Sequence, residues 1–112
     1  MIGKQNMLQL LHSLGYLYAD HGQNKRALVF QLIASRLEPE SRPVLRTLAH
    51  TFLSDGAPDK ALAVIARLRA LDDDDPMLDL LQGRALWRAG HKSEARRIFQ
   101  RFIVSRRPQT HA

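Results

Sequence analysis

The sequence has no cysteine, and no stretch of it approaches the length of an apolar membrane span. Without cysteine there can be neither a disulfide framework nor a thiolate metal site. The first 23 residues lack the long uncharged apolar run of a secretory signal peptide. These absences lead us to expect a cytoplasmic protein that does not insert into a membrane.

What the chain does contain is a repeat of 34 residues, the interval between successive members of four series. The series are Gly15, Ala49, Gly83; Tyr18, Phe52, Leu86; Gly22, Gly56, Gly90; and Ala27, Ala61, Ala95. With 112 residues, of which 45% are hydrophobic and 25% charged, the repeats fit one small globular domain.

Each repeat is typical of a helical hairpin. An apolar helix ends near the glycine, which can adopt the left-handed conformation of a helix terminus. A polar start then leads into a second helix, whose alanine lets the two helices approach closely. We therefore predict an all-α fold of three tandem tetratricopeptide-like hairpins, six helices forming a short right-handed solenoid. The expected helices span residues 5–20, 24–37, 43–54, 58–71, 76–89 and 93–105. The single domain 1–112 divides into repeats 8–41, 42–75 and 76–109, with a polar tail at 106–112.

The pattern resembles the tetratricopeptide repeat family over nearly the whole chain. Residues that match it are Leu14, Gly15, Tyr18, Gly22, Ala27, Ala34 and Pro39 in repeat one, Leu48, Ala49, Phe52, Gly56 and Ala61 in repeat two, and Gly83, Gly90, Ala95 and Phe99 in repeat three. Three positions depart from the pattern: Gln31 replaces an aromatic residue, Asp73 a proline and Gln82 a leucine.

The layout of three minimal repeats is also similar to that of small type III secretion export chaperones, most of all the YscY (SctY) type. That resemblance implies a bacterial cytoplasmic virulence chaperone. It would hold a small secreted subunit of the YscX (SctX) type as a heterodimer. Independently of the resemblance, the apolar last helix can be buried either by a partner or by self-association when the chain is alone. The alternatives are a chaperone of the needle subunit (YscG type) and a general interaction scaffold unrelated to secretion.

The family resemblance places the partner groove on the first helix of each repeat. The implied groove residues are His12, Tyr16, Ala19, Arg46, His50, Leu53, Leu80, Arg84, Trp87 and Arg88. Aromatic and arginine side chains suit an amphipathic helix that carries some acidic residues. A second candidate surface is the last helix, where Phe99 and Phe102 stand beside Ile98 and Ile103 with no following helix to cover them.

Charge is unevenly distributed along the chain. From Arg84 onward there are eight basic residues and one acidic residue, a charge of +7, whereas residues 1–83 carry −1. A basic end raises nucleic acid as a partner, but no nucleic-acid-binding motif accompanies it. We therefore favour a solvated basic surface or an acidic protein partner.

The acidic run from Asp72 to Asp75 lacks the alternating acids, glycine and distal glutamate of a calcium loop. We interpret it as a solvated loop between repeats, with Asp75 capping the helix that starts at Pro76. No phosphate-binding loop or nucleophile motif occurs. Neither His12 nor His50 has a cysteine, aspartate or glutamate on the same helix at the spacing of metal ligands. The sequence thus predicts that the protein is not an enzyme and binds no cofactor or metal. The alternative, which we consider less favoured, is a metal site shared by His12 and His50.

Overall fold

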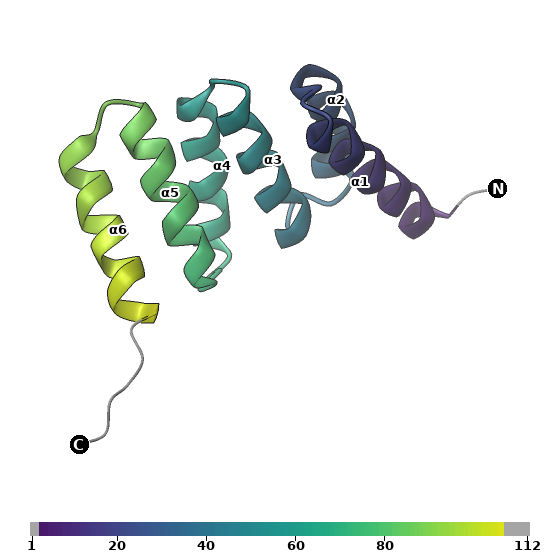
Figure 1. The fold of residues 1–112 in the computed structure, drawn as a ribbon. Coiled ribbons are helices and arrows are strands. Elements are labelled where there is room, and N and C mark those ends of the chain that lie inside the picture. Colours follow the sequence, from purple (N-terminus) through teal and green to yellow (C-terminus); the bar gives the residue numbers. More distant parts are fainter. Residues whose placement is uncertain (1–2, 107–112) are drawn as a thin grey trace.

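The computed structural model describes residues 3–106, and all six expected helices are present (Figure 1). They are α1 (Lys4–Asp20), α2 (Asn24–Leu37), α3 (Arg42–Ser54), α4 (Pro58–Ala70), α5 (Pro76–Arg88) and α6 (Lys92–Arg106). Each boundary lies within one residue of the predicted one, and no strand occurs in the described residues. The all-α fold of three hairpins is therefore confirmed. Of the predicted polar tail, Arg106 is the last residue of α6, and 107–112 lie outside the described residues.

The helices pack as three hairpins in a row. α1 packs with α2, α3 with α4 and α5 with α6, and contacts of α2 with α3 and of α4 with α5 join the hairpins. The backbones of neighbouring first helices also come close, α1 to α3 and α3 to α5, whereas within residues 3–106 the backbones of α2 and α4, and of α4 and α6, do not. The first helices therefore line the inner side of an elongated array measuring 59 × 33 × 26 Å (Figure 1).

The turn inside each hairpin depends on a glycine in the left-handed region. The three φ angles are 74°, 77° and 90°, at Gly22, Gly56 and Gly90. At the first of them, the N–H of Gly22 bonds to the Ala19 carbonyl at 3.0 Å and that of Gln23 to the Tyr18 carbonyl at 2.9 Å. This pair of bonds satisfies carbonyls that a helix end would otherwise leave free. The predicted role of the turn glycines is confirmed.

The acidic loop between α4 and α5 differs from its prediction. Asp75 does cap α5, since its carboxylate accepts a 3.0 Å hydrogen bond from the N–H of Met77. Asp72 adopts the left-handed conformation with φ of 56°, the role that glycine has in the other turns. Asp73, however, is only 5% exposed. The interpretation of the whole run as a solvated loop is wrong at Asp73, because this carboxylate is folded inward.

Small residues set the spacing within each hairpin. Ala27, Ala61 and Ala95 are completely buried. A Cβ atom added to Gly83 would lie 2.5 Å from Cε1 of Phe99, and one added to Gly15 would lie 2.7 Å from Cγ of Gln31. The two helices of the first and third hairpins therefore approach each other through a glycine, and a long side chain of the second helix lies across it.

The main core belongs to the middle hairpin. Its largest fully buried apolar side chains are Leu45, Leu48, Leu53, Ile65 and Leu68. These residues come from α3 and α4, and Leu28 of α2 and Leu78 of α5 join the same cluster. The flanking hairpins thus pack on a central one, which fixes the inner face of α3 as the middle of the array.

Candidate partner-binding groove

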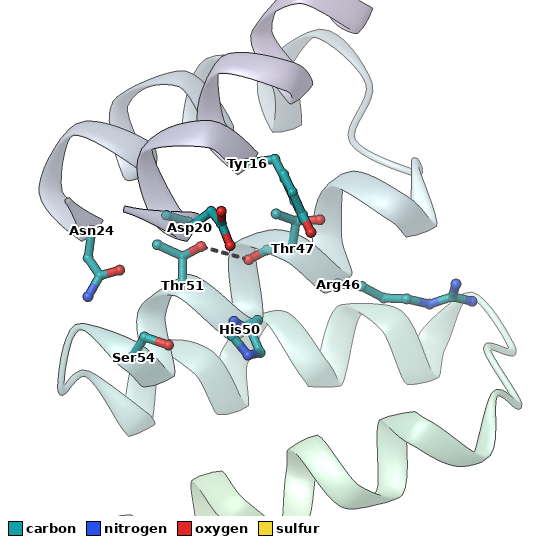
Figure 2. A pocket seen from close by; sticks show the side chains of 9 residues that line it. Tyr16, Asp20, Asn24, Arg46, Thr47, His50, Thr51 and Ser54 are labelled. Atoms are coloured by element: carbon teal, nitrogen blue, oxygen red, sulfur yellow. Dashed lines mark hydrogen bonds between the residues drawn. The ribbon is translucent and has the colours of Figure 1, made fainter. Parts of the chain in front are cut away.

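A continuous groove runs along the inner face of the array, formed by three open hollows. The first lies between α1 and α3, has a volume of about 490 Å³, and includes Tyr16, Arg46 and His50 (Figure 2). The second, of about 210 Å³, lies between α3 and α5 and again includes Arg46 and His50. The third, of about 340 Å³, shares Arg84 with the second. Because neighbouring hollows share side chains, they adjoin one another along the first helices.

The 34-residue period places the groove residues on corresponding turns of the three first helices. Tyr16 of α1, His50 of α3 and Arg84 of α5 are related by this interval, as are Asp20, Ser54 and Arg88. Within a helix, residues four apart share a face, so the inner stripe of α3 runs from Arg46 through His50 to Ser54. In Figure 2, Tyr16 and Asp20 extend from α1 toward this stripe.

Arg46 is held in place by the carboxylate of Asp73, which we had expected to be exposed to solvent. Its guanidinium donates two hydrogen bonds of 2.8 Å to Asp73, and Asp75 lies 3.8 Å away. These bonds from Arg46 lower the pKa of Asp73, and the same pairing raises the pKa of Arg46. Arg46 therefore contributes its apolar methylene groups to the groove. Its positive charge is partly neutralised, because the guanidinium is paired with Asp73.

His50 stands at the centre of the groove, where the first two hollows meet. Its pKa is lowered, first by desolvation from the surrounding protein and then by the positive charge of Arg84. A histidine with a lowered pKa is neutral at pH 7 and can both donate and accept a hydrogen bond. The cation of the groove centre is therefore Arg84, which forms no ion pair within residues 3–106.

The third hollow contains the aromatic anchor predicted from the sequence. Trp87 is 42% exposed, and Lys92 and Arg96 of α6 place their cations 5.1 and 5.8 Å from its ring centre. These cations hold the ring against α6, and Trp87 lines the hollow. Arg88 donates a 3.3 Å hydrogen bond to the carbonyl of Leu53, so it also ties α5 to the end of α3.

The remaining predicted residues separate into three groups. Ala19 lines the first hollow, Leu80 the second and Phe99 the third. His12 lies apart from these hollows, in a further depression beside Ser41 and Pro43. Phe102 is half-buried at the open end of α6. The structure does not bring His12 and His50 into one hollow, and the residues that it does unite are Tyr16, Arg46, His50, Leu80, Arg84 and Trp87.

Leu53 corrects the predicted set. It is 1% exposed and belongs to the central core cluster, so a partner in the groove does not reach it. The reason is its position on the helix: Leu53 lies three residues after His50, and the inner stripe of α3 continues to Ser54 instead. Ser54, Thr47 and Asn24 line the first hollow and were not predicted.

The burial of a second carboxylate, that of Asp79, was not predicted from the sequence. Asp79 of α5 is 7% exposed and accepts hydrogen bonds from Arg69 at 2.5 Å and from Arg101 at 2.7 Å. Burial raises the pKa of Asp79, but the bonds from Arg101 and Arg69 lower it by more, so the net shift is downward. At the basic C-terminal end, Arg101 is thus paired with Asp79, although its side chain is still 57% exposed. An acid at an inward position of a helix was the available signal.

The groove offers surfaces and hydrogen-bonding groups rather than a reactive centre. Among residues 3–106, no three histidine or acidic side chains gather as candidate metal ligands. Within the same residues, no helix combines the length and apolar character of a membrane span. No known protein family matches the chain, and no curated protein is significantly similar to it.

Proposed function

We propose that this chain is a partner-binding repeat protein that holds an amphipathic helix along its inner groove. The observation that carries the proposal is that the three hollows adjoin in a row: the first and second share Arg46 and His50, and the second and third share Arg84. Their surface combines apolar area from Leu80, Met77 and Trp87 with a few polar groups, the composition expected of a site for a helix with one apolar face.

The charges of the groove favour one orientation of the partner. Arg84 and Arg88 lie toward α5, whereas Asp20 lies in the first hollow at the α1 end. A helix bound along the groove places its acidic residues or its C-terminal end over α5, since the negative end of a helix dipole is attracted by cations. Its basic residues or N-terminal end lie near Asp20.

The specific role that we propose is that of a type III secretion export chaperone of the YscY (SctY) type in the bacterial cytoplasm. The support is the resemblance of the three-repeat pattern to that class, together with the hollows along the first helices. In this role the chain shields the amphipathic helix of a small secreted subunit before export. A needle-subunit chaperone of the YscG type is the second candidate within the same class.

The competing class is an interaction scaffold unrelated to secretion. Co-expression separates the two: the chain is produced together with the small protein encoded beside it, and mass is measured by light scattering. A partner that is soluble only with the chain, in a defined complex, supports the chaperone. The absence of a complex with that neighbour contradicts the export role and leaves the scaffold. Steeply salt-dependent binding to arbitrary duplex DNA would point to nucleic acid instead.

Substitutions on the partner-contacting surface locate the site. We expect Trp87→Ala to weaken partner binding by about 2 kcal/mol, roughly 30-fold, because tryptophan in a desolvated pocket dominates binding. Arg84→Ala should weaken binding to a smaller extent. Arg97→Ala is the matched control, since Arg97 is exposed on α6 and lines none of the three hollows. If Trp87→Ala and Phe102→Ala both leave the affinity unchanged, the partner uses neither the groove nor the last helix.

A further inference from the structure

α1 has an exposed apolar stripe that includes Leu10 and Leu17. The residues at the equivalent positions of α3 and α5 are buried inside the array. Leu10 corresponds by the 34-residue period to Val44 and Leu78, and these are 3% exposed while Leu10 is 47% exposed. Leu17 corresponds to Thr51 and Ala85, which are 1% and 0% exposed, yet Leu17 is 52% exposed. On α3 and α5 the stripe is covered by the second helix of the preceding hairpin. α1 therefore presents the same face with no hairpin before it in residues 3–106.

The last helix presents the complementary half of the same interface. Ala34 of α2 shares a core cluster with Val44, and Leu68 of α4 shares one with Leu78. Both second-helix residues are 0% exposed. Their equivalent on α6 is Phe102, which is only partly buried.

The next position shows the same contrast. Ser35 of α2 is 6% exposed, and Arg69 of α4 hydrogen-bonds across the hairpin boundary to Gln82 at 2.7 Å. Their equivalent on α6 is Ile103, which is 58% exposed. α6 is therefore a second helix with two apolar residues, Phe102 and Ile103, at forward-facing positions that no hairpin covers in the described part of the chain.

We infer that a second copy of this chain covers these faces, with α6 of one molecule packed on α1 of the next as α2 packs on α3. The spacing specifies the register. Ala34 precedes Val44 by ten residues and Leu68 precedes Leu78 by ten, so Phe102 meets Leu10 of the neighbouring molecule. By the same rule Ile103 meets Leu14, the equivalent of Gln82.

A second copy is favoured over an unrelated helix because both halves of the contact are present on one chain. The α2–α3 and α4–α5 boundaries show twice that these two faces fit each other. Solenoids that stay monomeric carry polar residues on their terminal faces, and here the first face offers Leu10, Leu14 and Leu17. A contact between different faces leaves each molecule with a free end, so the association extends head to tail without closing.

The test uses the purified full chain alone. We expect light scattering between about 10 µM and about 1 mM to give a mean mass that rises above the 12.8 kDa of the monomer and passes the dimer value without a plateau. Leu10→Glu blocks one face and Ile103→Glu the other, so each variant should be a monomer. Mixing the two variants leaves one intact face on each partner, and we expect a 1:1 dimer.

Val29→Glu is the matched control. Val29 is 56% exposed on α2, and its equivalents Ala63 and Arg97 are exposed as well, so the rise in mass should persist. Circular dichroism checks that the variants remain helical. Since the chain has no cysteine, oxidation of a mixture of Leu10→Cys and Phe102→Cys chains gives a second measurement, a covalent heterodimer.

Three results would overturn the inference. They are a monomeric chain over the whole concentration range, a mixture of blocked variants that stays monomeric, and an Ile103→Glu variant that still dimerises. The last result would indicate a symmetric contact of α1 with α1. The interface uses the ends of the array and not the groove, so its failure leaves the proposed partner site standing.

Discussion

Arg46, on the inner face of α3, donates two 2.8 Å hydrogen bonds to the carboxylate of Asp73 in the loop between α4 and α5. The side chain of Asp73 is 2% exposed and that of Arg46 is 40% exposed. The buried carboxylate of Asp73 therefore depends on the partly exposed guanidinium of Arg46 for these two hydrogen bonds. The pair links the middle of the groove to the loop that positions the third hairpin.

Removing Arg46 should destabilise the fold, because Asp73 would remain buried without its partner. We expect Arg46→Ala to lower the free energy of unfolding by about 2 kcal/mol, the scale of an uncompensated buried acceptor. Urea denaturation measures the change. Lys25→Ala is the control, since Lys25 is paired with Asp55 but is 85% exposed, and its effect should stay within about 0.5 kcal/mol. Equal effects of the two substitutions would contradict the structural role of Arg46.

The two buried carboxylates should make stability depend on acid pH. The pKa values of Asp73 and Asp79 are lowered in the folded chain, so the unfolded chain binds more protons near pH 4. Their contribution is complete above the pKa of an unfolded aspartate, about 3.9, and is lost as the pH falls through the lower folded values. Thermal unfolding from pH 7 down to pH 2 should show this loss. Asp79→Asn should flatten the pH dependence, and an unchanged slope would exclude Asp79 as its source.

The close approach of Gly83 to Phe99 should be sensitive to a single methyl group. We expect Gly83→Ala to destabilise the chain by about 1–3 kcal/mol, because its Cβ would lie 2.5 Å from the ring of Phe99. The middle hairpin has Ala49 and Ile65 at these two positions and buries both.

That comparison supplies the rescue experiment. The double variant Gly83→Ala/Phe99→Ile reproduces the pair of the middle hairpin and should recover part of the lost stability, as measured by urea denaturation. Gly3→Ala is the control, because nothing lies within 4 Å of the added Cβ. A double variant less stable than Gly83→Ala alone would show that the clash with Phe99 is not the cause.

We expect the chain to become more stable when Gln31 is replaced by an apolar residue of similar size. The side chain of Gln31 is buried at 1% exposure, and neither its Nε2 nor its Oε1 has a hydrogen-bond partner within the described residues. The equivalent residue in the middle hairpin is Ile65, which is also 1% exposed. We expect Gln31→Met to raise the free energy of unfolding by about 1 kcal/mol, because it keeps the shape and removes the unpaired polar atoms.

A shift of the urea midpoint to higher concentration, with an unchanged slope, is the expected reading. Gln100→Met is the control, since Gln100 is an exposed glutamine of α6. A loss of stability in Gln31→Met would show that the buried amide makes a favourable interaction.

Much of the architecture could be predicted from the sequence because its causes are local. A left-handed turn needs a residue such as Gly22, and a close helix crossing needs one such as Ala27. Both recur every 34 residues, and this repeat predicted six helices to within one residue. The resemblance to the tetratricopeptide family, rather than any pattern in this sequence, suggested Trp87 as a groove residue, and Trp87 does line the third hollow.

Only the tertiary structure decided which polar and apolar side chains are buried. Asp73 and Asp79 are acidic, yet they lie inside, where Arg46, Arg69 and Arg101 donate hydrogen bonds to them from other helices. Leu53 was predicted to line the groove but does not, because its side of α3 faces the core. Local sequence determines how a helix starts, repeats and ends. Which faces meet, and which charges find partners, depends on how separate helices pack, because burial and pairing are properties of side chains far apart in the chain.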